Sequence, residues 1–92
     1  MLSKWPTSSE LTLHLLNVLV SLGGEANSSN IDKSVISKLN LDKELLEKMR
    51  TPTRSEISYR LAWIRTKAKQ SELIEKTSAR GWRITPKGKE LI

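Results

Sequence analysis

Residues 54–85, RSEISYRLAWIRTKAKQSELIEKTSARGWRIT, decide the fold that this chain is predicted to adopt. The first half of this stretch repeats apolar residues at the spacing of a helix that buries one face. The residues on that face are Ile57, Leu61, Ile64 and Ala68. The pattern predicts a helix from Arg54 to Gln70, with basic, hydroxylated and aromatic residues on its other faces.

A β-hairpin is predicted directly after this helix, because the period of the sequence changes from 3.6 to 2. Residues 73–77 alternate as a short strand does. Residues 78–81 carry turn-forming side chains and end in glycine, and residues 82–85 form the returning strand.

A short terminal helix is expected to follow the hairpin. It starts at Thr85 and Pro86, since proline suits the first helical position. We expect Leu91 and Ile92, at its end, to fold back on the core.

The first helix of the chain is predicted over residues 8–22. Thr7 and Glu10 have the spacing of a capping box, and Gly23 can take the left-handed conformation that ends a helix. We expect this helix to be largely buried, because its apolar stripe is wide: Leu11, Leu13, Leu15, Leu16, Val18, Leu19, Val20 and Leu22. His14 lies within this apolar run and is assigned no chemistry.

Shorter helices are predicted between the first helix and the long one. Residues 27–30 supply caps and turns, and Ser29 with Asp32 has capping spacing for a helix that runs to about Leu39. Asp42 caps a third segment, whose inward-facing residues are expected to be Leu45, Leu46 and Met49.

The long helix is preceded by a stop and a start signal. Pro52 ends the preceding segment, and Thr53 with Glu56 repeats the spacing of a capping box. The order of elements is therefore three helices, a long helix, a two-stranded hairpin and a short helix. This order predicts one domain, residues 1–92, that is mainly α with a small β-hairpin (α+β) and has a winged helix-turn-helix fold.

The charge of the chain is segregated along the sequence. Its 92 residues carry a formal net charge of +6, with equal numbers of basic and acidic side chains in residues 1–50. All six excess positive charges therefore lie in residues 51–92. A localised positive field attracts a polyanion, and nucleic acid is the expected one.

Composition argues against several other classes of protein. The chain has no Cys and one His, so neither a disulfide framework nor a metal site is expected. The apolar stretch of residues 11–22 falls short of a membrane span and does not read as a signal peptide, so we expect a cytoplasmic protein. The carboxylates are scattered and the Lys-Gly-Lys of residues 87–89 is no phosphate loop, so we expect no enzyme, no catalytic residue and no cofactor.

Several of these residues also form a pattern found in a known family. The pattern consists of Arg60 and Trp63 in the long helix, then Arg80, Gly81, Trp82, Ile84, Thr85 and Gly88. In this respect the chain resembles the Mrr N-terminal domain, a winged helix that precedes the nuclease domain of Mrr-type restriction endonucleases. The run LGGEA at residues 22–26 also fits the family.

The resemblance covers nearly the whole chain and implies DNA recognition without cleavage. Glu72 stands where the family commonly has Gly before the first hairpin strand, and the hairpin tip is short. No nuclease domain follows Ile92, so the cutting activity of the family is not expected here.

We therefore predict a protein that reads double-stranded DNA by sequence or structure, as a transcriptional regulator or as the recognition part of a restriction-type system. The long helix would enter the major groove and the hairpin would lie on the backbone or in the minor groove. The candidate base and phosphate contacts are Arg50, Thr51, Thr53, Arg54, Ser55, Ser58, Tyr59, Arg65 and Lys69 in and before the helix, and Lys76, Ser78, Arg80 and Arg83 in the hairpin. Arg80, at the tip, is the leading candidate.

Other assignments stay open at this point. Trp63 and Trp82 are expected to pack the hairpin on the core, while Arg60 could face either the hairpin or a phosphate. An alternative function is a protein-interaction or dimerisation adaptor that binds a partner subunit through Leu91, Ile92 or Trp5. Single-strand or RNA binding is a third reading, disfavoured because only one exposed aromatic residue, Tyr59, is expected. A homodimer is expected by analogy with two-fold DNA readers.

Overall fold

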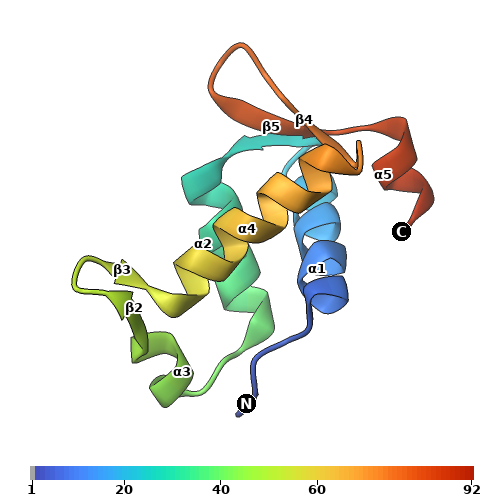
Figure 1. Cartoon of the computed structure of the whole chain (residues 1–92). Coiled ribbons are helices and arrows are strands. Elements are labelled where there is room, and N and C mark those ends of the chain that lie inside the picture. The colour runs from blue at the N-terminus through green and yellow to red at the C-terminus, as the bar shows by residue number, and fades with distance from the viewer. Residues whose placement is uncertain (1) are drawn as a thin grey trace.

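Three helices cross one another and a small sheet closes one end of the bundle (Figure 1). The computed structural model describes residues 2–92, and the fold is mixed α+β. The helices are α1 (Ser8–Ser21), α2 (Ser28–Leu39) and α4 (Glu56–Gln70). The sheet consists of β1 (Glu25–Asn27), β4 (Ile74–Lys76) and β5 (Gly81–Ile84). A smaller lobe contains α3 (Lys43–Glu47), β2 (Met49–Thr51) and β3 (Arg54–Ser55), and α5 (Pro86–Glu90) ends the chain.

Helix α1 begins and ends as its sequence predicts. The Thr7 hydroxyl accepts the Glu10 backbone N–H at 3.2 Å, and the Glu10 carboxylate accepts the Thr7 N–H at 3.1 Å. Hydrogen bonding to the Glu10 carboxylate lowers its pKa, with the Thr7 backbone N–H the larger cause and the Thr7 side chain the second. Gly23, with φ of 95°, takes the left-handed conformation after the last turn. The expected width of the buried stripe is wrong, because Leu13, Val20 and Leu22 are exposed.

Helix α2 is capped by a different residue from the one expected. The Asn27 side chain accepts the Asn30 N–H at 2.8 Å, so the helix begins before Ser29 and not at it. Asp32 therefore takes no part in capping, and its carboxylate instead accepts a hydrogen bond from Arg65 of α4. The helix ends at Asn40, which has a left-handed conformation with φ of 50°.

The segment between α2 and α4 contains an antiparallel ribbon that the sequence does not predict. Asp42 caps α3 as expected, but Leu46 and Met49 are exposed. Strands β2 and β3 then pair across the turn at Pro52. The ribbon delays the start of α4, so its N-cap is Ser55, and the predicted Thr53–Glu56 capping box does not form.

The predicted hairpin is confirmed, with Ile74 paired to Ile84 and Lys76 to Trp82. A third strand, β1, pairs with β5 on its other edge, giving the antiparallel order β1–β5–β4. Strand β1 has three residues, Glu-Ala-Asn, which is too short and too polar for a recognisable strand pattern.

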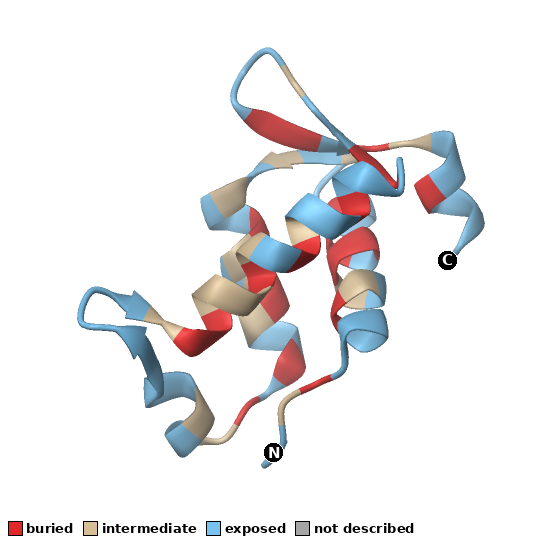
Figure 2. Cartoon of the chain, viewed as in Figure 1, coloured by how far each residue is buried: buried red, intermediate tan, exposed pale blue. Residues whose placement is uncertain are grey.

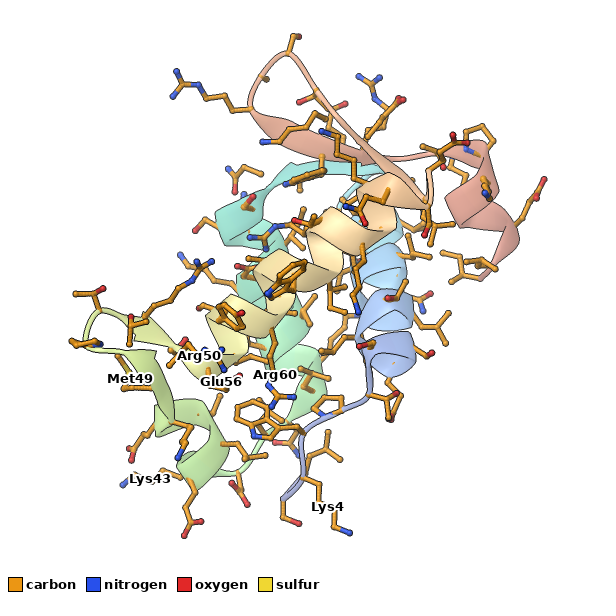
Figure 3. All side chains as sticks on the ribbon, in the orientation of Figure 1. Lys4, Lys43, Met49, Arg50, Glu56 and Arg60 are labelled. Carbon is orange, nitrogen blue, oxygen red and sulfur yellow. The ribbon has the colours of Figure 1, made fainter. Side chains whose placement is uncertain are left out.

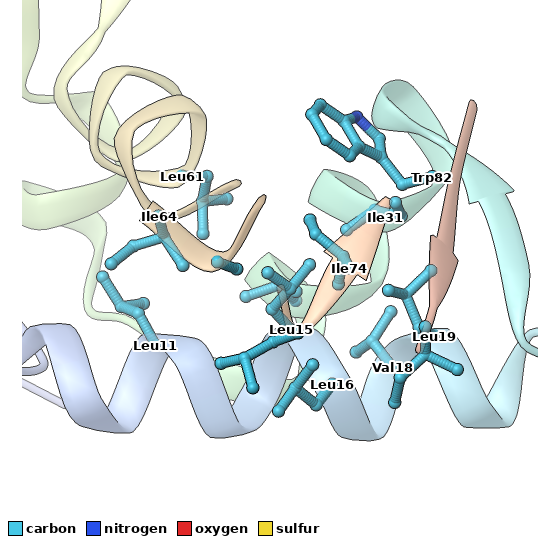
Figure 4. Packing of buried hydrophobic residues seen from close by; sticks show 14 of the residues in the cluster. Leu11, Leu15, Leu16, Val18, Leu19, Ile31, Leu61, Ile64, Ile74 and Trp82 are labelled. Atoms are coloured by element: carbon cyan, nitrogen blue, oxygen red, sulfur yellow. The ribbon is translucent and has the colours of Figure 1, made fainter. Parts of the chain in front are cut away.

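The core lies between the three helices and the sheet (Figures 2 and 4). The predicted stripe of α4 is confirmed, since all four of its apolar residues are buried: Ile57, Leu61, Ile64 and Ala68. Trp82 of β5 is also buried, as expected, and its indole N–H donates to the Ser28 hydroxyl at 3.0 Å. Leu91 and Ile92 are exposed, so the expectation that they fold back on the core is wrong. Across residues 2–92, every helix is too short or too polar to cross a bilayer.

Gly88 is the position where the fold tolerates a side chain least. A Cβ atom there would lie 2.3 Å from the Leu73 carbonyl oxygen and 2.9 Å from an Ile84 side-chain carbon. We predict that Gly88→Ala lowers the free energy of unfolding by about 1–3 kcal/mol, because α5 must move away from the sheet. Urea denaturation measures this loss. Lys87→Ala, at the exposed neighbouring position, is the control and should change stability by less than about 0.5 kcal/mol.

Candidate nucleic-acid interface

The outward face of α4 carries a stripe of uncharged residues, and basic residues lie near this stripe. Tyr59, Ala62, Trp63 and Thr66 follow one another at spacings of three and four, which places them on one side of the helix. The same four residues, with Arg54, line one shallow hollow. The single acidic residue of α4, Glu56, is buried and lies outside this stripe.

Glu56 organises the start of the helix (Figure 3). One carboxylate oxygen accepts a hydrogen bond from Arg60 Nε at 2.8 Å, and the other lies 3.5 Å from Arg50 Nη1. The Glu56 backbone N–H donates to the Lys48 carbonyl at 2.8 Å. The Glu56 side chain is 11% exposed and needs such partners, because the charge of a carboxylate is costly to bury alone. The α4 helix therefore presents no free negative charge.

Both arginines that bind Glu56 also stack on aromatic rings. The Arg50 guanidinium lies 4.2 Å from the centroid of Tyr59, and that of Arg60 lies 4.5 Å from Trp5. The Trp63 indole N–H donates to the Tyr59 hydroxyl at 2.8 Å. The aromatic pair is thus held in one arrangement by a hydrogen bond and a cation–π contact.

Trp63 corrects one expectation from the sequence. It is 50% exposed, so it does not pack the hairpin on the core, whereas Trp82 does. Its place in the helical period, opposite Ile57 and Leu61, is the signal that could have predicted this exposure.

The predicted contacts before and at the start of α4 fall into two groups. Thr51, Thr53 and Arg54 are exposed on the β2–β3 ribbon. Ser55 and Ser58 are half-buried, and the Ser55 hydroxyl caps α4 by accepting the Ser58 N–H at 3.2 Å. The ribbon therefore places its three exposed side chains beside the first turn of the helix.

Arg65 is not presented on this surface. Its side chain is 12% exposed and donates to the Asp32 carboxylate, which joins α4 to α2. Burial raises the pKa of Asp32, and the guanidinium groups of Arg65 and Arg54 oppose that rise. The guanidinium of Arg65 is thus committed inside the fold, which argues against its predicted phosphate contact.

The hairpin carries one arginine in ion pairs, Arg83, and two cations that form none within residues 2–92, Lys76 and Arg80. Arg83 lies between two carboxylates, 3.6 Å from Glu25 and 3.4 Å from Glu75. Lys76 Nζ lies 4.8 Å from the centroid of the Trp82 ring. Ser78 and Arg80 are exposed in the turn, and Arg80 has a left-handed backbone with φ of 61°.

Free positive charge therefore surrounds the stripe. Among residues 2–92, ion pairs engage Lys43, Arg50, Arg60, Arg65 and Arg83. The cations on α4, the ribbon and the hairpin that form no ion pair are Arg54, Lys67, Lys69, Lys76 and Arg80. Lys67 was not among the predicted contacts. In the described part of the chain, no three His, Asp or Glu side chains gather as metal ligands would.

The comparisons with known proteins agree with the residue pattern. The family described as Mrr N-terminal domain matches residues 9–92. No curated protein and no solved structure shows a significant match to the chain.

We predict that Glu56→Gln destabilises the domain by about 1–3 kcal/mol, because two guanidinium groups lose the carboxylate that they share. Urea denaturation measures the loss. The matched control is Glu47→Gln, at an exposed glutamate whose one ion pair within residues 2–92 spans 3.9 Å, and it should change stability by less than about 0.5 kcal/mol. Equal effects of the two substitutions would contradict the role assigned to Glu56.

Proposed function

The chain belongs to the Mrr N-terminal domain family, and from that premise we propose that it is a winged-helix module that binds double-stranded DNA. Family membership associates the module with restriction systems. The order of α1, α2, α4 and the β4–β5 hairpin supports the winged-helix assignment. In this assignment α4 is the recognition helix and β4–β5 is the wing.

One observation carries the proposal. The only carboxylate on α4 is buried between two arginines, while exposed unpaired cations lie at both ends of the helix and on the hairpin. A duplex carries negative charge along its whole length, so a surface with this arrangement attracts it without local repulsion.

The proposed docking follows from where the exposed groups lie. The first turns of a recognition helix reach base edges in the major groove. Here those turns carry Tyr59, and the neighbouring ribbon adds Arg54, whose guanidinium can bind guanine through two hydrogen bonds. Lys69, at the far end of the helix, and Arg80, in the hairpin turn, are placed for phosphates on either side.

A protein-interaction module is the alternative, and a second surface favours it. Leu13 and Val20 of α1 and Leu91 and Ile92 at the C-terminal end are exposed apolar residues. Apolar side chains of this kind can seat a partner subunit or a second copy of the chain. This role is compatible with DNA binding, because these residues lie outside α4 and the hairpin.

The test of DNA binding is fluorescence anisotropy of a labelled duplex across a salt series. We predict that the logarithm of affinity falls linearly with the logarithm of salt concentration, at a slope that corresponds to roughly 4–8 phosphate contacts. A protein-interaction module without DNA binding would show no duplex affinity even at low salt.

Charge-reversal substitutions test whether α4 and the hairpin form the DNA-binding surface. We predict that Arg54→Glu weakens duplex binding at least about tenfold, the loss expected when a bidentate base contact is removed. Arg80→Glu should also reduce the salt slope by about one or more, as expected for a phosphate contact. The control is Lys89→Glu on α5, which makes the same change in net charge beside Val20 and away from α4. If Lys89→Glu weakens binding as much as the other two, binding depends on net charge alone and the proposed surface is wrong.

A further inference from the structure

Trp63 stands between two hollows on the surface of α4. One is the shallow hollow of about 220 Å³ on the side of Tyr59 and Thr66. The other is a larger groove of about 590 Å³ between α4 and the segment that leads into α1. Trp63 lines both hollows and is 50% exposed, so part of its indole is open to a ligand.

The larger groove is lined by apolar, hydroxyl-bearing and cationic side chains. The lining residues on which the argument depends are Leu11, Arg60, Trp63, Ile64 and Lys67. Leu11 and Ile64 belong to the core and form a rigid floor. Arg60 is held by Glu56 and Trp5, whereas Lys67 forms no ion pair within residues 2–92. The groove therefore offers one fixed aromatic wall and one cation that is free to bind.

We propose that this groove binds an unstacked nucleotide, with the base against the Trp63 indole and the phosphate on Lys67. Aromatic side chains bind bases by stacking without regard to sequence, and a nearby lysine neutralises the backbone. The indole is already oriented by its hydrogen bond to Tyr59, so stacking requires little further ordering. This inference rests on the proposed function and deepens it, since it names the form of DNA that the module prefers.

The preferred ligand is a duplex with at least one extrahelical nucleotide. Trp63 is shared between the groove and the outward face of α4, so a base leaving a duplex bound on that face can reach the groove. Unstacking a paired base costs free energy, and a base that is already unpaired avoids that cost. The sequence led us to expect Tyr59 as the exposed aromatic residue, but Tyr59 is half-buried and Trp63 is the exposed one. Trp63 is therefore the side chain on this surface that can stack on an unpaired base.

The experiment compares a fully paired duplex with the same duplex carrying a single-nucleotide bulge, by fluorescence anisotropy at one salt concentration. The wild-type chain should bind the bulged duplex between about fivefold and a hundredfold more tightly, the range for one stacked base. Trp63→Ala should abolish this preference, so that the variant binds the bulged and the paired duplex with equal affinity. Leu13→Ala, another exposed apolar truncation, lies on α1 outside the groove and is the matched control.

The phosphate part of the site is tested separately. Lys67→Gln should reduce the preference for the bulged duplex, whereas Lys89→Gln, which removes the same charge from α5, should not. Titration with free dAMP tests whether the groove also binds a mononucleotide that is not part of a DNA strand. Quenching of tryptophan fluorescence in the wild-type chain that is lost in Trp63→Ala would show such binding.

Two results would overturn the inference. Equal binding of both duplexes by the wild-type chain would contradict the nucleotide site but not the proposed DNA binding. A preference for the bulged duplex that survives Trp63→Ala would also contradict the nucleotide site. No binding of either duplex and no quenching by dAMP would overturn the proposed function together with this inference.

Discussion

A single buried carboxylate joins three separate segments of this fold. Glu56 receives Arg50 from the β2–β3 ribbon and Arg60 from α4, and Arg60 in turn lies over Trp5 in the segment before α1. Its own backbone N–H binds the Lys48 carbonyl, so the ribbon is attached to the helix by main chain and side chain together. Because a buried carboxylate without partners is strongly disfavoured, these segments must assemble in one arrangement.

The same interaction determines what α4 shows to solvent. With its only acidic residue turned inward, the helix has exposed hydroxyl, aromatic and basic groups and no exposed carboxylate. Arg50 also reaches Tyr59, and Tyr59 holds Trp63, so the buried charge is connected to the exposed indole through a chain of direct contacts. The proposed base and nucleotide contacts therefore lie on a surface whose geometry is fixed before any ligand arrives.

The sequence predicted those parts of the fold that depend on short-range rules. Apolar periodicity located α1 and α4, and the Thr7–Glu10 capping box and Pro86 located helix starts correctly. The ribbon was missed because its strands are short and all but one of their residues are exposed, which leaves no apolar alternation to read. Strand β1 was missed for a related reason, since it exists only through pairing with β5, 54 to 58 residues away.

The sequence predicted the candidate surface only in part, because it does not show which basic side chains form ion pairs within the fold. Counting residues assigns ten cations to the second half of the chain, but only coordinates show that Arg65 and Arg83 are engaged by Asp32, Glu25 and Glu75. Asp32 lies 33 residues from Arg65, and Glu25 lies 58 residues from Arg83, so no local spacing rule reveals these two pairs.

Ion pairing thus divides the cations into two classes with different physical roles. The paired arginines connect segments of the fold, whereas the unpaired side chains are exposed to solvent. Releasing counterions from a polyanion requires the second class, because a guanidinium already neutralised within the protein gains little from a phosphate. The unpaired class surrounds the rigid aromatic pair on α4, so charge would bring the polyanion to this surface and the aromatic side chains would choose among the bases it offers.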